Sequence, residues 1–287
     1  MKYINKTTNE ALFAAQQLHA WRDAFHNESG QSFIEICSDV ASTSERVWDL
    51  LKNYTGEDYS QDLLREALKS EQGDICCYCG CELIDLRTVI EHFLRKSGDK
   101  CARTYNYLNL LLSCDGNNFS KKHTIQEGET WETIATKYEM TVKELKNKNK
   151  QKVFRIKNNL TIIPPPRHCD AAKLSIDTPI INPTVLPDCW DRFPYKFDGS
   201  IDETKADDLA KATIEVLNLN AESLKRKRKA VWKDAKKAYS DDAEINQYLD
   251  EEDTTAVLKR TRELLASELN QTYHLCIVRR AYLMSWL

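Results

Sequence analysis

The chain has 287 residues, of which 41% are hydrophobic and 30% charged, and this composition can support roughly two domain cores. Its 41 basic and 44 acidic residues give a formal net charge of −3, which argues against a surface that is basic all over but allows a local basic patch. No run approaches the ~18 apolar residues of a membrane span, and the N-terminus lacks the apolar core of a secretory signal, so we expect a cytoplasmic protein without membrane contact.

The first 75 residues are predicted to be helical. Thr7 and Glu10 have the spacing of a capping box, so a helix is expected to begin there. Apolar side chains then recur at helical intervals, at Ala14, Leu18, Trp21 and Phe25. A second helix is predicted over residues 43–51, and a third over residues 60–71, ending at Gly73. The third helix carries three leucines that we expect on one buried side: Leu63, Leu64 and Leu68.

Cysteines, histidines, prolines and short apolar runs dominate from residue 76 to about 200, and helical periodicity returns after residue 202. The predicted fold class is therefore α+β: mainly helical, with a small zinc-containing core in the middle of the chain. We predict four regions: an N-terminal helical region (1–75), a discontinuous core (76–122 with 165–200), an insert (123–164) and a C-terminal helical region (201–287).

The insert has a pattern of its own. A short strand from His123 precedes a helix capped by Thr130, a second helix opens at Thr141, and a closing strand ends before Pro164. The stretch resembles a LysM domain, which implies a groove for N-acetylglucosamine polymers between residues 128–131 and 158–160. It departs from the family in having two asparagines where Pro-Gly is usual, and the alternative is a docking or purely structural insert.

Ten cysteines in a chain without an export signal favour metal ligands and buried thiols over disulfides. Cys76 and Cys79 form a C-x-x-C pair, the spacing at which two thiolates bind one zinc ion from a tight turn. Cys114 and Cys169 are the candidates for the second pair, although they lie 55 positions apart. Removing the 42-residue insert leaves a separation of 13, and strands that pair would bring the ends of the insert together, so we predict a structural zinc site.

Other cysteines compete for these roles. The alternative ligands are Cys77, Cys81, Cys101 and Cys189, whereas Cys37 and Cys276 lie on apolar helical faces and are expected to be buried thiols. A C-x-x-C pair also serves redox chemistry, and a redox protein would bind no zinc.

Acidic, imidazole and amide side chains lie between the two cysteine pairs. Glu91 and His92 end a predicted strand, and Asn109 precedes an apolar run. This order resembles the HNH (ββα-metal) nucleases, in which a neutral histidine takes a proton from water and one divalent cation with oxygen ligands offsets charge on the leaving oxygen. The resemblance implies hydrolysis of phosphodiester bonds with Mg²⁺ or Mn²⁺.

The resemblance also assigns roles to individual residues. His92 is the expected general base and Glu91 a ligand of the catalytic cation, while Asn109 holds the loop that aims the base. Asp170 fills the third motif position as the second ligand, although a histidine or asparagine is usual there. Two alternatives stay open for that position: His168, and Asn118 together with Lys121. Lys173 is expected to contact a phosphate.

A basic block from Lys225 to Lys229 lies in the C-terminal helical region. Such a run is often only a solvated helix face, but beside a nuclease motif it is a candidate nucleic-acid contact. We predict substrate contacts from Lys225, Arg226 and Arg228. Because the whole chain is slightly acidic, we expect it to bind nucleic acid weakly by itself.

Segments on either side of the motif indicate which group of HNH proteins the chain resembles. They include the segment 64–73 before the first cysteine pair, Ile180-Ile181-Asn182-Pro183, Phe193-Pro194-Tyr195 and the segment 213–220. Together these resemble the PtuB-type HNH proteins of Septu and retron-associated anti-phage systems. The resemblance implies an SMC-like ATPase partner (PtuA) and a nucleic-acid substrate, phage DNA or host RNA. The competing function is a zinc-stabilised adaptor that recognises a glycan or protein through the insert and has no nuclease activity.

Overall fold

The computed structural model describes fourteen segments of the chain: residues 1, 3–30, 35, 48–49, 52–53, 60–84, 87–96, 103–116, 123–138, 140–149, 161–162, 167–173, 179–269 and 276–285. Within them the protein is rich in helix and has two small antiparallel sheets, which confirms the α+β class.

The first helix, α1 (Asn9–Ser29), begins one residue later than the capping box predicts. Thr8 is the N-cap, and its hydroxyl accepts a hydrogen bond from the backbone N–H of Ala11 at 3.2 Å. Thr7 is unsuited to this role because both its N–H and its hydroxyl donate to the side chain of Asn5. The predicted apolar stripe is confirmed: Ala14, Leu18 and Trp21 are fully buried, and Phe25 packs partly against the core.

The next complete helix, α4 (Gln61–Gln72), lies where the third helix is predicted. Ser60 caps its N-terminus, and Gly73 ends it with a left-handed backbone (φ 68°). Leu64 and Leu68 are fully buried, but Leu63 is 42% exposed, because neighbouring helical positions lie 100° apart and the buried stripe runs through Leu64 instead. Of the helix predicted over residues 43–51, only residues 48–49 lie within the described part, and both are helical.

The central sheet is a hairpin of β1 (Thr88–His92) and β2 (Leu110–Cys114). The strands are antiparallel, with His92 opposite Leu110 and Thr88 opposite Cys114. A short 3-10 helix, η3 (Tyr107–Asn109), leads into β2. On the other edge of β2, the side-chain amide of Gln72, the last residue of α4, bonds both backbone groups of Leu112. It accepts from the Leu112 N–H at 2.7 Å and donates to the Leu112 carbonyl at 2.9 Å.

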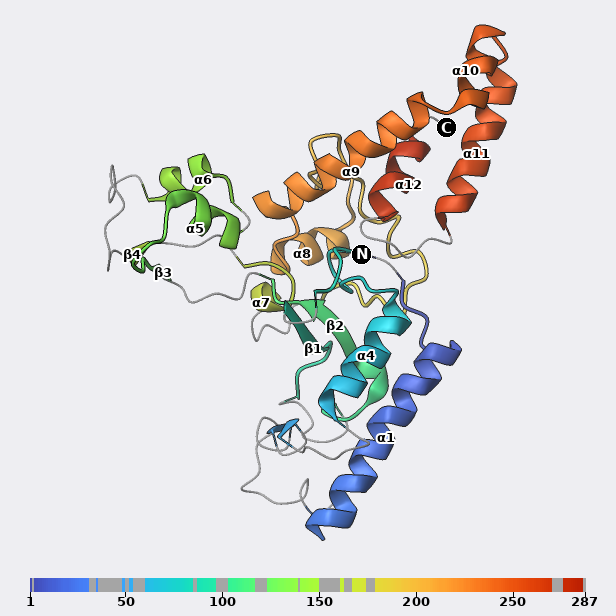
Figure 1. The fold of residues 1–287 in the computed structure, drawn as a ribbon. Coiled ribbons are helices and arrows are strands. Elements are labelled where there is room, and N and C mark those ends of the chain that lie inside the picture. Colours follow the sequence, from blue (N-terminus) through green and yellow to red (C-terminus); the bar gives the residue numbers. More distant parts are fainter. Residues whose placement is uncertain are drawn as a thin grey trace.

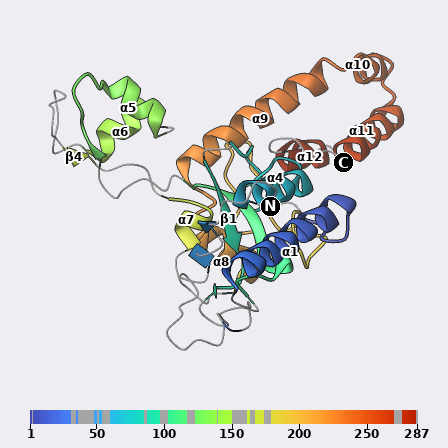
Figure 2. The ribbon, with the colours of Figure 1, turned by 60° about the horizontal axis from the view of Figure 1, so that its bottom comes forward.

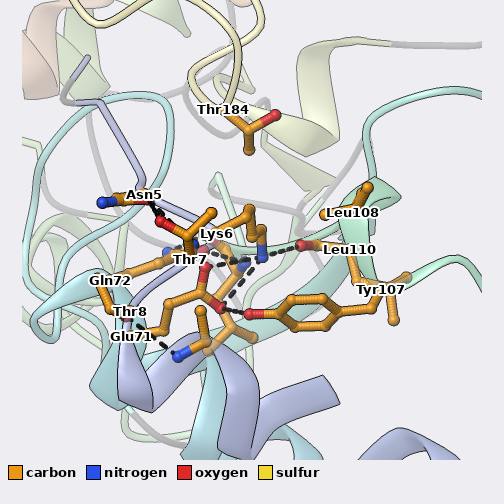
Figure 3. Close-up of polar contacts among 12 residues, drawn as sticks. Asn5, Lys6, Thr7, Thr8, Glu71, Gln72, Tyr107, Leu108, Leu110 and Thr184 are labelled. Atoms are coloured by element: carbon orange, nitrogen blue, oxygen red, sulfur yellow. Dashed lines mark hydrogen bonds and ion pairs between the residues drawn. The ribbon is translucent and has the colours of Figure 1, made fainter.

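The N-terminal segment is tied to this hairpin by a buried lysine (Figure 3). The ammonium of Lys6 contacts the carboxylate of Glu71 at 2.9 Å and donates to the carbonyl of Leu110 at 2.8 Å, while the hydroxyl of Tyr107 also donates to Glu71. Burial lowers the pKa of Lys6, and the charge of Glu71 partly opposes this shift. The contact joins three segments that are far apart in the sequence.

The insert has the predicted order of elements. It contains β3 (His123–Thr124), α5 (Trp131–Lys137), α6 (Val142–Lys148) and β4 (Thr161–Ile162), and β3 pairs antiparallel with β4. Thr130 and Thr141 cap the two helices as expected. Its apolar residues form a core of their own, separate from the main one.

The base of the insert is closed by a direct backbone contact. His168 N–H donates to the carbonyl of Gly116 at 2.9 Å, so the two chain segments that flank the insert lie side by side. Gly116 has a positive φ of 57°, and a Cβ atom there would lie 1.8 Å from the carbonyl oxygen of His168. Only glycine allows this approach.

After the insert, the described residues 179–207 form turns with one isolated β-bridge between Tyr195 and Ile201, and the other described residues are mainly helical. The helices are α7 (Asp170–Lys173), α8 (Asp208–Val216), α9 (Glu222–Ser240), α10 (Ala243–Asp250), α11 (Thr254–Leu269) and α12 (Cys276–Met284). The main core cluster contains residues of α1, α4, β2 and α8 and includes both Met1 and Val278. Residues from both sides of the boundaries predicted at 75 and 200 therefore share this cluster. A smaller cluster joins α9, α10 and α12.

Figure 1 shows how these parts are arranged. The β1–β2 hairpin lies at the centre, with α4 and α1 along one side and α8 and α9 on the other. The helices of the insert stand apart from this body, and α10 and α11 extend away from it, as Figure 2 shows from a second direction. Helix α12 returns to pack against α9, and its Val278 belongs to the main core. Among the described residues, no helix combines the length and apolar character that crossing a membrane requires.

Substituting Gly116 tests the closed base of the insert. We expect Gly116→Ala to lower the melting temperature by several degrees, because the positive φ alone costs about 1–3 kcal/mol and the new Cβ also displaces the His168 carbonyl. Gly128→Ala is the matched control, since Gly128 also has a positive φ (82°) but no atom within 4 Å of the added Cβ. Equal melting temperatures of the two variants in thermal denaturation would contradict this close approach.

Candidate metal centre and the adjacent carboxylates

The four cysteines predicted to bind zinc lie together. The sulfur atoms of Cys76, Cys79, Cys114 and Cys169 are all within 4.8 Å of one another. Two of the separations, Cys76 to Cys169 and Cys79 to Cys114, are 3.9 Å. Four thiolates around a tetrahedral zinc ion, with Zn–S distances of about 2.3 Å, lie about 3.8 Å apart. The cluster therefore has the dimensions of a site that could hold a metal ion such as zinc.

Three local structures place these sulfur atoms. The first pair lies in a tight turn, in which Cys76 N–H donates to the Cys81 carbonyl at 2.8 Å and Gly80, with φ 72°, donates back to Cys76. Cys114 is the last residue of β2, and its N–H donates to the sulfur of Cys76 at 3.3 Å. Cys169 has a left-handed backbone (φ 54°), which its hydrogen bond to the carbonyl of Leu217 holds in place.

The pKa values of two of the four thiols, Cys76 and Cys79, are lowered, whereas those of Cys114 and Cys169 are raised. Burial opposes a negative charge on Cys76, but hydrogen bonds from Cys114 and Cys169 outweigh burial and lower its pKa well below the ordinary value. Hydrogen bonds from Cys114 and Cys169 likewise lower the pKa of Cys79. A metal ion needs thiolate ligands, and the lowered pKa values of Cys76 and Cys79 favour that state.

The competing cysteines do not join the cluster. Cys77, Cys81 and Cys189 are buried, but none belongs to the group of sulfur atoms that could share one ion among the described residues. Burial raises the pKa of Cys77 well above its ordinary value and that of Cys189 to about 11. Cys37 and Cys101 lie outside the described residues, and only the backbone of Cys276 is described, within α12.

Helix α7 connects the cysteine cluster to Glu91. Asp170 follows Cys169 directly, and a hydrogen bond joins its carboxyl group to that of Glu91. Lys173, one turn later, forms an ion pair with Glu91 Oε1 and donates to the carbonyl oxygens of His92 at 3.1 Å and Phe93 at 2.7 Å. The predicted role of Lys173 in phosphate contact therefore needs correction: its ammonium is buried as the counter-ion of Glu91.

The pKa values of the two carboxyl groups shift in opposite directions. Burial and the neighbouring charge of Glu91 raise the pKa of Asp170 to about 8. Burial alone would also raise the pKa of Glu91, but hydrogen bonds from Asp170, Lys173 and Tyr78 lower it. At neutral pH Glu91 is therefore the ionised member of the pair. Close carboxyl groups of this kind are also the hard oxygen donors that a divalent cation binds.

His92 is buried on the opposite face of β1. Its Nε2 atom lies 2.9 Å from the carbonyl oxygen of Thr104, and its ring packs edge-on against Trp48 with centroids 4.7 Å apart. A carbonyl oxygen only accepts, so Nε2 carries the proton and Nδ1 keeps its lone pair. Burial lowers the pKa of His92 to about 4, which leaves the ring neutral at pH 7.

Asn109 holds the loop that follows His92. Its side-chain oxygen accepts from the N–H of Leu94 at 2.6 Å, and its nitrogen donates to the carbonyls of Leu94 at 2.9 Å and Arg103 at 2.7 Å. Both ends of the loop are therefore bound to a single amide. This geometry agrees with the positioning role expected from the sequence.

The candidate residues for the third motif position have different surroundings in the structure. His168 lies against the cysteine cluster, with Nδ1 3.2 Å from the sulfur of Cys169 and 4.0 Å from that of Cys114. Asp170 contacts Glu91. Asn118 and Lys121, the other alternative, lie outside the described part of the chain.

The basic residues on α9 that were predicted to contact substrate make contacts within the protein instead. Arg228 is only 1% exposed, donates to the carbonyl of Leu219 at 2.7 Å and stacks on the ring of Tyr195, so it is a structural residue. Arg226 pairs with Glu144 of the insert, and Lys225 pairs with Glu222 one turn earlier. Within the described structure, the three residues predicted to contact substrate all have protein partners.

Two residues of the site were missed from the sequence. Tyr78, between the two cysteines of the turn, donates to Glu91 at 2.7 Å. Its position inside the C-x-x-C pair would have been enough to name it as a candidate from the sequence. Trp48 covers His92 from a segment 44 positions earlier, and no spacing rule connects the two.

Comparison with known proteins identifies one part of the chain. Residues 123–164 match the family model of the LysM domain, which agrees with the strand and helix order of the insert. Neither the curated proteins nor the solved structures contain a significant match to the chain.

Metal analysis tests the cluster directly. We expect the purified chain to contain about one zinc ion, and Cys169→Ser to lose it, because three thiolates no longer complete the tetrahedron. Cys189→Ser is the matched control, since Cys189 is equally buried but lies outside the cluster. Zinc content measured by elemental analysis would contradict the assignment if both variants retained the same amount.

Proposed function

We propose that the protein is a metal-dependent HNH endonuclease that hydrolyses phosphodiester bonds of nucleic acid. The observation that carries the proposal is the meeting of Glu91, at the end of β1, with Asp170, at the start of α7, beside the four-cysteine cluster. Two antiparallel strands followed by a helix are the elements of a ββα-metal core, and here the helix begins directly after a cysteine ligand.

His92 is suited to act as the general base. A base must be neutral at working pH and must have one nitrogen lone pair available. Burial keeps the ring neutral, with its pKa at about 4, and the carbonyl of Thr104 fixes the proton on Nε2. Nδ1 is then the atom that accepts a proton from water. A pKa this low makes the base weak but keeps it active over a wide pH range.

Glu91 and Asp170 are the residues that would hold the catalytic cation. Both are oxygen donors, and the charge of Glu91 contributes to the raised pKa of Asp170, so a cation between them would relieve their repulsion when both are ionised. Lys173 and Tyr78 both bond to Oε1 of Glu91, so Oε2 remains for Asp170 or for a cation. A bound Mg²⁺ or Mn²⁺ ion would offset charge on the leaving oxygen of the phosphodiester.

The substrate has to reach both faces of β1. Consecutive strand residues point to opposite faces, so Glu91 and His92 lie on either side of the strand end. A phosphate group placed across this end, beside the loop that Asn109 holds, would meet both residues. In the family that the sequence resembles, the nuclease acts with an SMC-like ATPase in anti-phage defence, and we extend this partner and role to the present chain as part of the proposal.

Replacing His92 tests the mechanism. We expect His92→Ala to lower the rate of Mg²⁺- or Mn²⁺-dependent nicking of DNA or RNA at least a hundredfold, the usual range for loss of a general base. The assay uses the chain together with its ATPase partner. His19→Ala is the control, because His19 is exposed on α1, far from the site in sequence. Equal cleavage by wild type and His92→Ala, with both folded, would remove the mechanism.

A second candidate function rests on the LysM match. LysM-like modules imply recognition of N-acetylglucosamine polymers, and the insert has its own core and paired terminal strands. One side of the groove implied by the sequence, residues 128–131, is described, while residues 158–160 lie outside the described part. In this alternative the protein is an adaptor that recognises a glycan or protein through the insert.

Removing the insert separates the two functions. With residues 123–164 replaced by a short Gly-Ser linker, we expect cleavage to persist, because Gly116 and His168 already meet at the base of the insert. Binding of chitin oligosaccharides, measured by calorimetry, should be lost if the insert is a glycan sensor. Loss of cleavage in a deletion variant that still contains zinc would show that the insert takes part in the nuclease reaction.

A further inference from the structure

The surface of α9 carries a row of lysines that the proposed active site does not use. Four buried residues of this helix, Leu224, Arg228, Ala235 and Tyr239, share the side that packs against the protein, and Ser223 in the first turn is buried as well. Lys229, Lys233, Lys236 and Lys237 are all exposed. At 100° per residue these four lysines fall within an arc of about 100° on the side away from those four buried residues.

We infer that these four lysines form a binding face for the sugar-phosphate backbone of nucleic acid. The inference deepens the proposed nuclease function and rests on it, since it names the surface that would hold the substrate. It also replaces the predicted contacts from Lys225, Arg226 and Arg228, which have protein partners instead.

The dimensions of the row suit a polyanion. Lys229 and Lys237 are eight positions apart, so the row is about 12 Å long at 1.5 Å per residue. A nucleic-acid duplex carries one negative charge per about 1.7 Å of its axis, and several phosphates therefore lie within reach of the four ammonium groups. Neither ion pairs nor hydrogen bonds hold these lysine side chains within the described part of the protein.

The surroundings leave the row accessible. All four lysines are exposed, and the loop that contains Gly199 packs against the backbone of α9 near Lys225 and Lys229. The N-terminal part of α9 lies over α8, on the side of the molecule where α7 and the hairpin are found. A nucleic-acid strand held along α9 would therefore lead toward the core that contains the four-cysteine cluster.

The composition of the row favours nucleic acid over a protein partner. Protein interfaces are depleted in lysine and enriched in aromatic residues and arginine, and their centres are apolar. Here the four cations are all lysines, and only alanines, Ala230 and Ala238, are exposed beside them as apolar residues of the helix. Trp232, the aromatic residue of this segment, packs against Tyr282 on the inner side. A net charge of −3 for the chain makes the row a local feature rather than part of a general positive surface.

The test compares two variants of the full chain with the same change in charge. In the first, Lys229, Lys233, Lys236 and Lys237 are replaced by Gln; in the control, the exposed Lys143, Lys205, Lys211 and Lys259 are replaced by Gln. Each set removes four positive charges, so both variants have a formal net charge of −7 instead of −3. Fluorescence anisotropy with a labelled 20-base-pair DNA duplex, and separately with a 20-nucleotide RNA strand, measures binding at several salt concentrations without added Mg²⁺ or Mn²⁺.

We expect the α9 variant to bind at least about tenfold more weakly than the control. Four phosphate contacts correspond to a slope of about −3.6 in a plot of log K against log salt for duplex DNA, and this slope should fall toward zero in the α9 variant alone. A larger loss on DNA than on RNA, or the reverse, identifies the preferred strand. Equal affinities of the two variants for both probes overturn the inference.

Two further outcomes keep this inference distinct from the nuclease proposal. If wild type never cleaves but the α9 variant alone loses binding, the nuclease proposal fails and the binding face stands. If the α9 variant binds and cleaves like wild type, the nuclease proposal stands and the binding face is wrong. Displacement of the labelled duplex by polyglutamate as readily as by unlabelled duplex would indicate an acidic protein partner and also overturn the inference.

Discussion

The four-cysteine cluster is the interaction on which the central structure depends. Its members come from a turn, from the end of β2 and from the start of α7, and Cys76 and Cys169 are 93 positions apart in the sequence. Bringing such distant segments together has an entropic cost that a metal–thiolate site can offset. Because Asp170 follows Cys169, the same cluster also decides where α7 presents its polar side chains to Glu91.

Buried charges around this core are compensated locally. Lys173 neutralises Glu91, and Lys6 neutralises Glu71 in a second contact on the other side of the sheet. Buried ion pairs of this kind contribute little net stability compared with apolar packing, but removing one partner leaves an unpaired buried charge and is strongly destabilising. The two buried ion pairs therefore favour folds in which their partner segments lie together. The hydrogen bond from Lys6 to the Leu110 carbonyl also ties the N-terminal segment to β2, the strand that carries Cys114.

Two peripheral parts extend from this core. The insert has its own apolar cluster. The segments that flank it meet at Gly116 and His168, so the insert adds little constraint on the positions of the cysteines. Helix α9 keeps its lysines on the side opposite its buried residues, and Glu144 of the insert pairs with Arg226 near its N-terminus.

Local patterns in the sequence determined much of this protein. The helices with their apolar stripes, the order of elements in the insert and the four metal-spaced cysteines follow from short-range periodicity, capping and spacing, all of which act between near neighbours. Only the tertiary structure decided which charges are buried and paired. Lys173 and Arg228 look like free cations in the sequence, but α7 packs against β1 and Tyr195 lies against α9, so both cations are enclosed. Trp48 covers His92 for the same reason: long-range packing leaves no mark in local spacing.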